Sequence, residues 1–394
     1  MRLLILLIAL AAPGWGAYGY YIHYTPAASQ VDNGPHTDFP VLIDTTHNDL
    51  RTTGNGGFVT DPQGDDIVPH TDAACSSPIT AFDLVAYDGT NGRIRMHVNI
   101  SSLSSSSNLY LCFGNSAITT PQGTATSTWN SGFVAVYHLG DGSTCGTSDS
   151  TTNALTLTNT GTVNGTTGKI YGACGTNWGT TRYLERANSA TWNMTSAMTI
   201  SAWVKAGTFS SYRTIIAKVN TAASVRAFEL DTELTTGKLR GIVTVSSSLK
   251  VAVSSSVVST SAFNHVAFAA DTTDIQTYIN GAADGSAVST GGSLDTNTDK
   301  ICIGALCVSP PTDTWDGTVD EIRVSNVRRS AGWLATEYNS GTPSTFWTTG
   351  SPTAVTTSKR RMIIIQCSCY CSFSLFNHLL RLLISNSTAR QAHR

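Results

Sequence analysis

Short runs of alternating apolar and polar residues fill positions 18–118, and turn-forming residues separate them. The clearest runs are YYIHYT, FPVLID, ITAFDLVAYDG, GRIRMHVNI and NLYLCFGN, with Gly, Asn and Asp between them. A period of two places successive side chains on opposite faces of a strand, so each run predicts a strand with one buried face. The block therefore predicts a β-sandwich of about five or six strands.

The same pattern returns after a stretch rich in Thr, Gly and Pro. We interpret residues 119–128 as a linker and residues 129–349 as a second β domain. Its predicted strands include MTISAWVKAG, YRTIIAKV, KLRGIVTVS, FNHVAFAADTTDIQTYING and WDGTVDEIRVSNV. Many short strands separated by turns are typical of a sandwich or jelly roll. The predicted fold class is all-β, with two β-sandwich domains.

Composition narrows the possible partners. The 394 residues carry a formal net charge of -2, and only 13% of them are charged. Nucleic-acid-binding proteins usually present a basic stripe, so no nucleic-acid partner is expected. A helical bundle would be richer in Glu, Lys and Arg.

The first residues predict export. Arg2 precedes an apolar run from Leu3 to Ala12, and the small residues Gly14 and Gly16 favour cleavage after Gly16. The run is shorter than the roughly 20 residues that span a bilayer, which disfavours the alternative of a membrane anchor. Residues 1–16 are therefore predicted to be a signal peptide, and the protein is predicted to be secreted or cell-surface.

Export makes the cysteines candidates for disulfides. Three of the nine lie in the tail, and the six others allow 15 pairings. Proximity favours two pairs and leaves a third, although the other pairings stay open. Zinc is a poor alternative, because there is no CxxC pair and the His residues are scattered. The favoured pairs are Cys302–Cys307, Cys145–Cys174 and Cys75–Cys112.

Two segments resemble known families. DFPVLIDTTHNDL, GDDIVPHTD and FDLVAYDGTNGRIRMHVNISSLSSSSNLYLCFGN, in this order within residues 18–118, resemble the family called DUF2341, for which the resemblance implies no activity. MTISAWVKAG, FNHVAFAADTTDIQTYINGAADG and WDGTVDEIRVSNVRRSAGWLATEYNS resemble the LamG-like jelly roll of the concanavalin A-like lectin/glucanase superfamily. The second domain is accordingly expected to be a jelly roll of that type.

The segment WDGTVDEIRV matches the final strand of that jelly roll. Its apolar positions Val319, Ile322 and Val324 do not alternate strictly, which predicts a bulge near Asp320 and Glu321. The resemblance implies that Asp320 helps to hold one structural calcium ion, with Asn177 as a companion ligand. The alternatives are that the acid hydrogen-bonds a neighbouring loop, or that these acids form the solvent-facing side of the strand.

The segment FELDTEL raises the question of catalysis. Glu229, Asp231 and Glu233 alternate along a predicted strand and would share one face. Glucanases of the same superfamily use a Glu-x-Asp-x-Glu strand, which would make Glu229 the nucleophile, Asp231 a tuner of protonation and Glu233 the acid/base. The favoured alternative is a solvent-facing strand that ends near Glu233.

Aromatic residues near predicted loops suggest carbohydrate binding, because jelly-roll lectins stack sugar rings on Trp or Tyr. The favoured alternative for each of these aromatics is a place at the edge of the core. Trp203 is expected in the core, and His265 is expected to be a partly buried structural residue. The candidates for sugar contact are Trp178, Tyr183, Trp192, Tyr212, Arg213 and Trp315.

Residues 350–394 break the pattern. KRRMIIIQCSCYCSFSLFNHLLRLLI is long enough for a membrane helix, but its flanking Lys and Arg residues oppose the positive-inside rule. A disordered or adventitious tail is favoured over an anchor. The sequence as a whole predicts a non-catalytic recognition module that binds a glycan or a cell-surface polymer. A retaining β-glycan hydrolase and a structural module of a surface or virion fibre are the alternatives.

Overall fold

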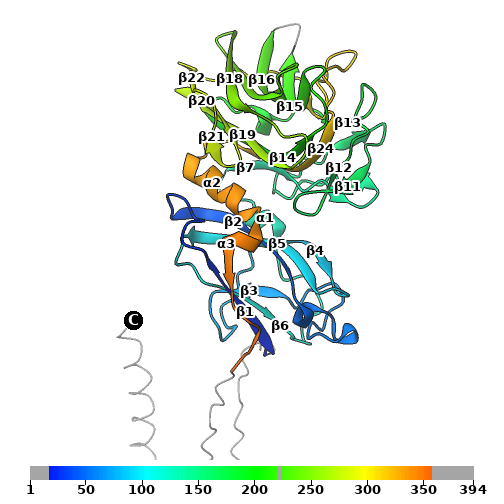
Figure 1. Cartoon of the computed structure of the whole chain (residues 1–394), viewed down its shortest axis with the longest axis vertical. Helices are drawn as coiled ribbons and strands as arrows, with labels where there is room; N and C mark the ends of the chain where they lie inside the picture. Colours follow the sequence, from blue (N-terminus) through cyan, green and yellow to red (C-terminus); the bar gives the residue numbers. More distant parts are fainter. Residues whose placement is uncertain (1–16, 131, 221–223, 357–394) are drawn as a thin grey trace, which may run out of the picture. The chain divides into compact units, whose positions relative to one another are not determined.

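The computed structural model describes residues 17–130, 132–220 and 224–356. The predicted signal peptide and the tail from residue 357 onward, with its three cysteines, lie outside the described residues. The described chain is nearly all β-structure and forms two β-sandwiches, as predicted (Figure 1). No helix in these described ranges has the length and apolar character needed to cross a membrane.

The first sandwich packs one sheet with the order β25–β1–β6–β3 against another with the order β2–β5–β4, and β26 also pairs with β1. In β2 and β5 the alternating apolar residues point into the core, where Val41, Ile43, Met96 and Val98 are fully buried. The strands are β1 (Tyr20–Pro26), β2 (His36–Thr46), β3 (Val68–His70), β4 (Phe82–Asp88), β5 (Arg93–Leu103), β6 (Leu109–Phe113), β25 (Trp347–Thr349) and β26 (Thr353–Ala354). Short helical turns are η1 (Asn48–Leu50), η2 (Thr53–Asn55) and α1 (Ala125–Thr128).

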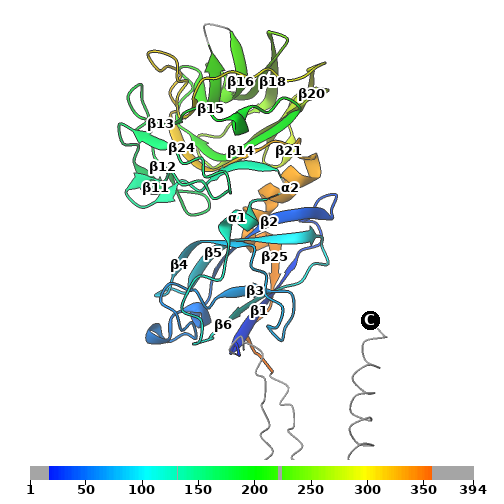
Figure 2. The ribbon, with the colours of Figure 1, turned by 180° about the vertical axis from the view of Figure 1, so that it is seen from behind.

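The C-terminal strands of the described chain belong to this first sandwich. β25 pairs antiparallel with β1, with Tyr24 opposite Thr349, although the sequence pattern predicted that residues up to 349 belong to the second domain. Figure 2 shows β25 in orange among the blue strands. A three-residue strand carries too little local pattern to reveal its partner. The stretch interpreted as a linker also contains α1, whose Thr128 is buried.

The second sandwich has a seven-stranded sheet and a nine-stranded sheet within the described residues. The first has the order β10 (Thr158–Thr160), β13 (Tyr183–Arg186), β23 (Ile301–Ile303), β15 (Arg213–Asn220), β16 (Val225–Thr232), β17 (Lys238–Val245) and β18 (Ser248–Val257). The second has the order β11 (Gly165–Thr167), β12 (Gly172–Cys174), β24 (Gly317–Ser325), β14 (Ala197–Ala206), β19 (Asn264–Asp271), β20 (Asp274–Ile279) and β21 (Ala282–Ala283), with β22 (Val288–Ser289) on β20 and β7 (Phe133–Tyr137) on β24. The remaining elements are β8 (Gly140–Asp141), β9 (Thr144–Cys145), η3 (Ala190–Trp192), α2 (Ala331–Ser340) and α3 (Pro343–Phe346).

Strand β24 is covered on both faces. Val319, Ile322 and Val324 enter the core of the second sandwich, while Asp320 and Glu321 are buried on the opposite side. The register against β14 shifts in this region, and Glu321 has a positive φ of 51°, so the predicted bulge is confirmed. The alternative in which these acids face solvent is wrong, because residues of the first sandwich such as His97 lie over this face.

One apolar core joins the two sandwiches. Phe39 of β2 and Trp333 of α2 belong to the same buried cluster as Ala267 and Ala269 of β19 and Tyr278 of β20. Helix α2 contacts both β2 and β21 and lies between the sandwiches (Figure 1). Residue 355 is the last of this single compact unit.

The three disulfides connect the pairs that proximity favoured. Cys75 is bonded to Cys112, Cys145 to Cys174 and Cys302 to Cys307. The first ties the loop after β3 to β6, and the second ties β9 to β12. The third closes the start of the loop that follows β23.

Candidate functional site

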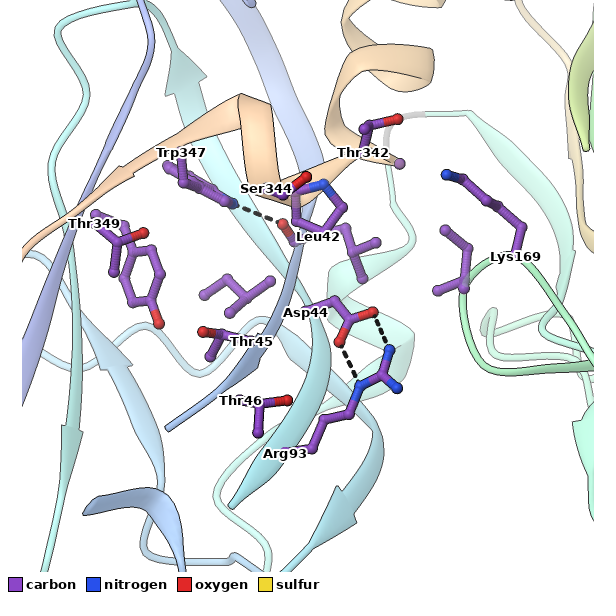
Figure 3. A pocket seen from close by; sticks show the side chains of 15 residues that line it. Leu42, Asp44, Thr45, Thr46, Arg93, Lys169, Thr342, Ser344, Trp347 and Thr349 are labelled. Carbon is purple, nitrogen blue, oxygen red and sulfur yellow. Dashed lines mark hydrogen bonds and ion pairs between the residues drawn. The ribbon is translucent and has the colours of Figure 1, made fainter. Parts of the chain in front are cut away.

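A polar pocket of about 440 Å³ opens beside β2 (Figure 3). Five parts of the chain line it: β1, β2 with β5, the loop before β12, the connection from α2 into α3, and β25. Residues far apart in sequence therefore meet only in the folded protein. The lining consists of Tyr24, Leu42, Ile43, Asp44, Thr45, Thr46, Arg93, Lys169, Ile170, Gly341, Thr342, Pro343, Ser344, Trp347 and Thr349.

The charged groups of the pocket are Asp44, Arg93 and Lys169. The guanidinium of Arg93 donates two hydrogen bonds to the Asp44 carboxylate, from Nε at 2.9 Å and from Nη2 at 2.8 Å. Arg95 Nε lies 3.5 Å from the same carboxylate. Lys169 comes from the loop before β12, and its ammonium group lies 5.1 Å from the centre of the Trp203 ring, with no carboxylate partner among the described residues. Two cations against one anion leave the lining with net positive charge.

Hydroxyl and apolar groups complete the pocket. Trp347 lies along one side, where its Nε1 donates to Leu42 O at 2.9 Å. Polar groups that fix orientation, set in partly apolar walls, are the usual composition of a small-ligand site. The hydroxyl groups belong to Thr45, Thr46, Thr342, Ser344 and Thr349.

Several predicted sugar-stacking residues are buried instead. Trp178, Trp192 and Trp315 are 8%, 0% and 2% exposed and belong to the core of the second sandwich. Trp178 Nε1 donates to Gly317 O at 3.0 Å. This burial leaves little ring surface for stacking, and sugar contact by these three rings stays a prediction. An aromatic residue next to a Gly-rich turn has the same local sequence whether it packs in the core or contacts a ligand, so the sequence alone does not distinguish the two roles.

The other predicted contact residues lie on the second sandwich, outside the 440 Å³ pocket. Tyr183 is 9% exposed and lines a second pocket of about 380 Å³ together with Lys300. Tyr212 is 36% exposed, but the Arg240 guanidinium lies 4.3 Å from its ring centre. Arg213 donates to Thr208 O and Thr314 O, so it holds its own loop. Of these residues, Tyr212 alone presents a ring at the surface.

The acids of β16 are buried, which corrects the expectation of a solvent-facing strand. Phe228 and Leu230 enter the core, and Glu229 and Asp231 point to the opposite face with exposures of 1% and 0%. The loop after β23 lies over this face, where Leu306 packs on Ala217 and Val219. Glu233 follows the end of the strand, as predicted, and its backbone N–H donates to Lys238 O in the turn.

Both buried carboxylates are held by arginines. Arg226 Nη1 contacts Glu229, and Arg240 contacts Asp231 with its Nε at 2.8 Å. Burial raises the pKa of Glu229 to about 8, with Asp231 adding to the effect and the two arginines opposing it. A retaining glycosidase needs two carboxyl groups that can reach a sugar from a cleft. These two carboxyls instead face guanidinium groups beneath a loop.

Asp320 and Asn177 have different partners. Asp320 Oδ2 accepts from Lys169 N at 2.7 Å and from Ile170 N at 2.9 Å, so the alternative of a loop hydrogen bond is confirmed. Asn177 accepts from Asn164 N and donates to Thr162 O. The described contacts of the two side chains share no residue. Calcium binding by Asp320 and Asn177 stays a prediction.

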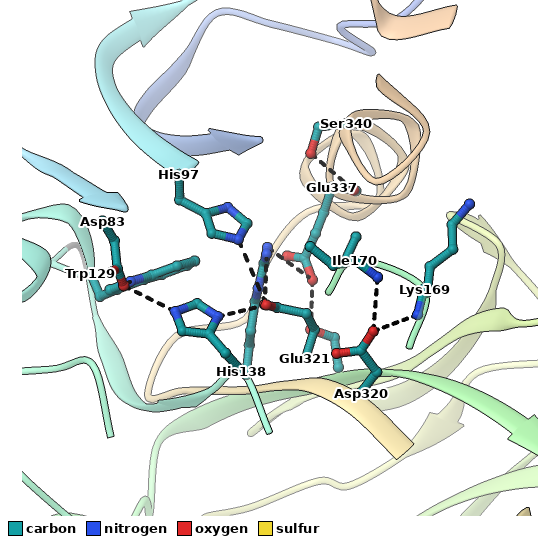
Figure 4. Close-up of polar contacts among 12 residues, drawn as sticks. Asp83, His97, Trp129, His138, Lys169, Ile170, Asp320, Glu321, Glu337 and Ser340 are labelled. Atoms are coloured by element: carbon teal, nitrogen blue, oxygen red, sulfur yellow. Dashed lines mark hydrogen bonds and ion pairs between the residues drawn. The ribbon is translucent and has the colours of Figure 1, made fainter. Parts of the chain in front are cut away.

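A buried cluster of imidazole and carboxylate groups lies where β24 meets the first sandwich (Figure 4). His138 stands between two acids, with Nδ1 2.5 Å from Glu321 Oε1 and Nε2 3.0 Å from Asp83 Oδ2. Trp129 Nε1 donates to the same Asp83 oxygen at 2.7 Å. His97 Nε2 lies 3.8 Å from Glu321 Oε1. The cluster therefore combines β4 and β5 of the first sandwich with β24 and the residue after β7.

The pKa values in this cluster follow from burial and from the paired charges. Burial opposes the charged form of His138, yet Glu321 and Asp83 raise its pKa to about 10. Burial likewise opposes ionisation of Asp83, but His138 and Trp129 lower its pKa to about 2. His138 also holds the pKa of Glu321 well below its usual range against the effect of burial.

A second layer of polar contacts extends the cluster to α2. Arg323 Nη2 lies 3.3 Å from Glu321 Oε2, and Arg323 Nη1 lies 3.8 Å from Glu337 Oε1. Glu337 also contacts His265 Nε2 at 3.0 Å and accepts from Ser201 Oγ at 2.6 Å. His265 is 1% exposed, more deeply buried than predicted. Trp203 is buried as predicted, on the face of its sheet that lies toward Leu42.

Neither the pocket nor the cluster was predicted from the sequence. His97 in RMHVNI and His138 in AVYHLG each follow apolar strand residues, which is the only local signal for either. Nothing in the local pattern of β5 indicates that its histidine faces a carboxylate in a strand more than 200 residues away. Such a contact is a property of the packed sheets.

Residues 178–335 match the family model of the concanavalin A-like lectin/glucanases superfamily. The match covers most of the second sandwich and leaves the first unmatched, so the resemblance of the first to DUF2341 stays a prediction. No curated protein matches the sequence.

Several solved structures are similar to parts of this chain. The binding domain of Paraclostridial Mosquitocidal Protein 1 has a TM-score of 0.44 at 13% identity, over 53% of this chain and 52% of that one. Domain 4 of AbnA, a GH43 extracellular arabinanase from Geobacillus stearothermophilus, was solved in complex with arabinotriose. It has a TM-score of 0.41 at 19% identity, and the alignment covers 53% of this chain and 98% of that domain. The botulinum neurotoxin serotype G binding domain has a TM-score of 0.42 at 11% identity, and the alignment covers 52% of this chain and 50% of that domain. This chain thus spans about half the length of the two toxin domains.

Proposed function

We propose that this protein is an exported recognition module that binds carbohydrate, or another hydroxyl-rich surface polymer, without cleaving it. The observation that carries the proposal is the 440 Å³ pocket beside β2, with its hydroxyl, cationic and apolar lining. The family model matched by residues 178–335 describes lectins and glucanases, two classes of protein that act on carbohydrate. The three disulfides are what an oxidising extracellular environment favours.

The charge of the pocket favours a saccharide that carries an acidic group. Arg93 and Lys169 are two cations, and Asp44 is the one acid that lines the pocket with them. Guanidinium and ammonium groups make charge-assisted hydrogen bonds to carboxylate that are stronger than those to neutral hydroxyls. The proposed ligand is therefore a glycan that contains uronic or sialic acid, not a neutral glucan.

Recognition rather than hydrolysis is supported by the acids of β16. Glu229 and Asp231 are buried and paired with arginines, and neither lines the described pockets. A hydrolase would need these carboxyls free to donate a proton or to attack the sugar. We therefore place ligand binding in the pocket and assign the β16 acids to the stability of the sheet.

The test is binding of the purified protein to an array of acidic and neutral glycans, followed by titration of the best ligand. Lys169→Ala should weaken binding at least about tenfold, because it removes one of the two cations. Lys250→Ala on β18, outside the pocket, is the matched control and should bind as the wild type does. Tyr212→Ala tests the competing location on the second sandwich.

The outcomes separate the possibilities. Loss of binding in Lys169→Ala with retention in Tyr212→Ala supports the pocket. The reverse result would move the site to the loops of the second sandwich. If the folded wild-type protein binds no glycan on the array, the proposal is overturned and a structural role in a surface assembly is favoured.

A further inference from the structure

We propose that His97, His138 and Glu321 form a binding site for a divalent metal ion of the zinc class, and that this ion ties the two sandwiches together. The three ligand atoms would be His97 Nε2, His138 Nδ1 and Glu321 Oε1. All three lie within 4.8 Å of one another (Figure 4). The proposal is independent of carbohydrate binding.

The spacing of the three atoms suits a small divalent ion. Two ligands bound to zinc at about 2.0–2.1 Å in tetrahedral geometry are roughly 3.3 Å apart. The distance from Glu321 Oε1 to His138 Nδ1 is shorter than this value, at 2.5 Å, and the distance from Glu321 Oε1 to His97 Nε2 is longer, at 3.8 Å. A metal ion would replace the proton between His138 and Glu321 and draw His97 inward. Since all three atoms lie within 4.8 Å of one another, no pair has to approach by more than about 1.5 Å to reach this spacing.

His97 is the observation that points to a ligand rather than to a simple ion pair. Its side chain is fully buried, and neither ring nitrogen has a hydrogen-bond partner among the described residues. Buried polar groups are nearly always hydrogen-bonded, because an unpaired one forfeits its hydration without compensation. Coordination through Nε2 would satisfy this imidazole with the carboxylate toward which it already points.

His138 is oriented in the way that metal-binding histidines usually are. Such residues donate the ring N–H that does not bind metal to a carboxylate, which sets the tautomer. Asp83 Oδ2, 3.0 Å from His138 Nε2, provides that acceptor. Trp129 Nε1 donates to the same oxygen at 2.7 Å and so positions Asp83. This arrangement leaves Nδ1 directed at Glu321.

The choice of metal follows from the ligand types. Two imidazoles and one carboxylate suit zinc and other late first-row ions, whereas calcium and magnesium prefer all-oxygen sites. Three protein ligands leave a fourth position for water. The sequence argued against zinc because the His residues are scattered, and the fold brings two of them together.

The position of the ligands predicts what the ion does. His97 lies on β5 of the first sandwich, whereas Glu321 lies on β24 and His138 follows β7 in the second. A metal bound by all three would stabilise the folded state, since a preformed site is absent from the unfolded chain. Zinc should therefore raise the melting temperature of the joined sandwiches.

The test uses the purified protein, freed of metal by a chelator and then dialysed against zinc. Wild type should retain one zinc per chain and melt at a higher temperature than the chelated protein. His97→Ala should lose at least about tenfold in zinc affinity. His23→Ala, which removes a histidine of β1 outside the cluster, is the control and should retain the ion.

Cobalt provides a test that needs no variant, in case His97→Ala fails to fold. Cobalt-loaded wild type should show visible absorption bands typical of a four- or five-coordinate site with nitrogen and oxygen ligands. Failure of wild type to retain stoichiometric zinc would overturn the proposal. So would equal retention by folded His97→Ala, or a cobalt spectrum that matches the hexahydrated ion.

Discussion

At the scale of single residues, Asp320 shows that two acids next to one another can have separate tasks. Asp320 uses Oδ2 to accept the backbone N–H groups of Lys169 and Ile170, and its Oδ1 has no hydrogen-bond partner among the described residues. Glu321 turns toward His138 instead. The bulge between them separates the two side chains, because an extra residue re-aims the strand.

This geometry gives different expectations for two substitutions of Asp320. Asp320→Asn keeps an acceptor oxygen for both N–H groups and should change the free energy of unfolding by less than about 1 kcal/mol. Asp320→Ala leaves two buried donors unpaired and should cost about 2–4 kcal/mol. Urea denaturation of the two variants measures the difference.

The same experiment tests the predicted calcium ion. If calcium were required at Asp320, the asparagine variant would be as unstable as the alanine variant. A chelator would then lower the stability of wild type by a similar amount. Equal stability of wild type with calcium and with chelator assigns Asp320 to the loop contact alone.

At the scale of elements, the outer face of β16 and β17 is held by charge pairs instead of apolar packing. Asp231 lies directly opposite Arg240 in the register of the two strands, and the guanidinium donates through both Nε and Nη2. Burial raises the pKa of Asp231, and the hydrogen bonds of Arg240 oppose that shift. The ring of Tyr212 lies against this pair, with the Arg240 guanidinium 4.3 Å from the ring centre.

Breaking this pair should destabilise the sheet strongly. Asp231→Ala leaves Arg240 with an unpaired and largely buried charge, which costs about 3–5 kcal/mol. The double variant Asp231→Ala/Arg240→Ala should lose about 1–3 kcal/mol less than the sum of the single losses, because the two groups interact directly. Thermal or urea unfolding of all four proteins gives the coupling.

Glu233→Ala is the matched control for the same strand. Glu233 follows the strand end and contacts Thr236 in the turn, so its removal should stay within about 0.5 kcal/mol. Glycan hydrolysis that disappears in Glu229→Gln would contradict a purely structural role for the acids of β16.

At the scale of the whole molecule, the described chain is two sandwiches with one continuous core. Phe39 and Trp333 pack within the same cluster as Ala267 and Tyr278, and β25 returns from the second sandwich to pair with β1. Neither sandwich can lose its structure without exposing apolar surface of the other. Coupled unfolding is the physical consequence.

Calorimetry should therefore record one unfolding transition for both sandwiches. Trp333→Ala removes a large side chain from the shared cluster, should cost about 3–5 kcal/mol, and should lower the whole transition. Thr348→Ala, a substitution at an exposed position of β25, is the control and should leave the temperature of the transition unchanged. Two well-separated transitions, with only one shifted by Trp333→Ala, would contradict a shared core.

Local pattern alone predicted much of this protein. The runs MTISAWVKAG and GRIRMHVNI became β14 and β5, because alternation records which side chains share a face. The bulge in β24 was also visible, since Val319, Ile322 and Val324 depart from alternation. Proximity in the chain favoured the correct disulfides, because short loops bring cysteines together most easily.

Tertiary structure decided what covers each face. Alternation cannot tell solvent from a second layer of protein. Glu229 was expected to face solvent, and a solvent-facing side was one alternative for Asp320 and Glu321, but all three residues are buried. The pocket beside β2 and the cluster around His138 each join residues from distant parts of the chain. Their partners depend on how the sheets pack, and packing is a property of long-range contacts that the period of a single strand does not contain.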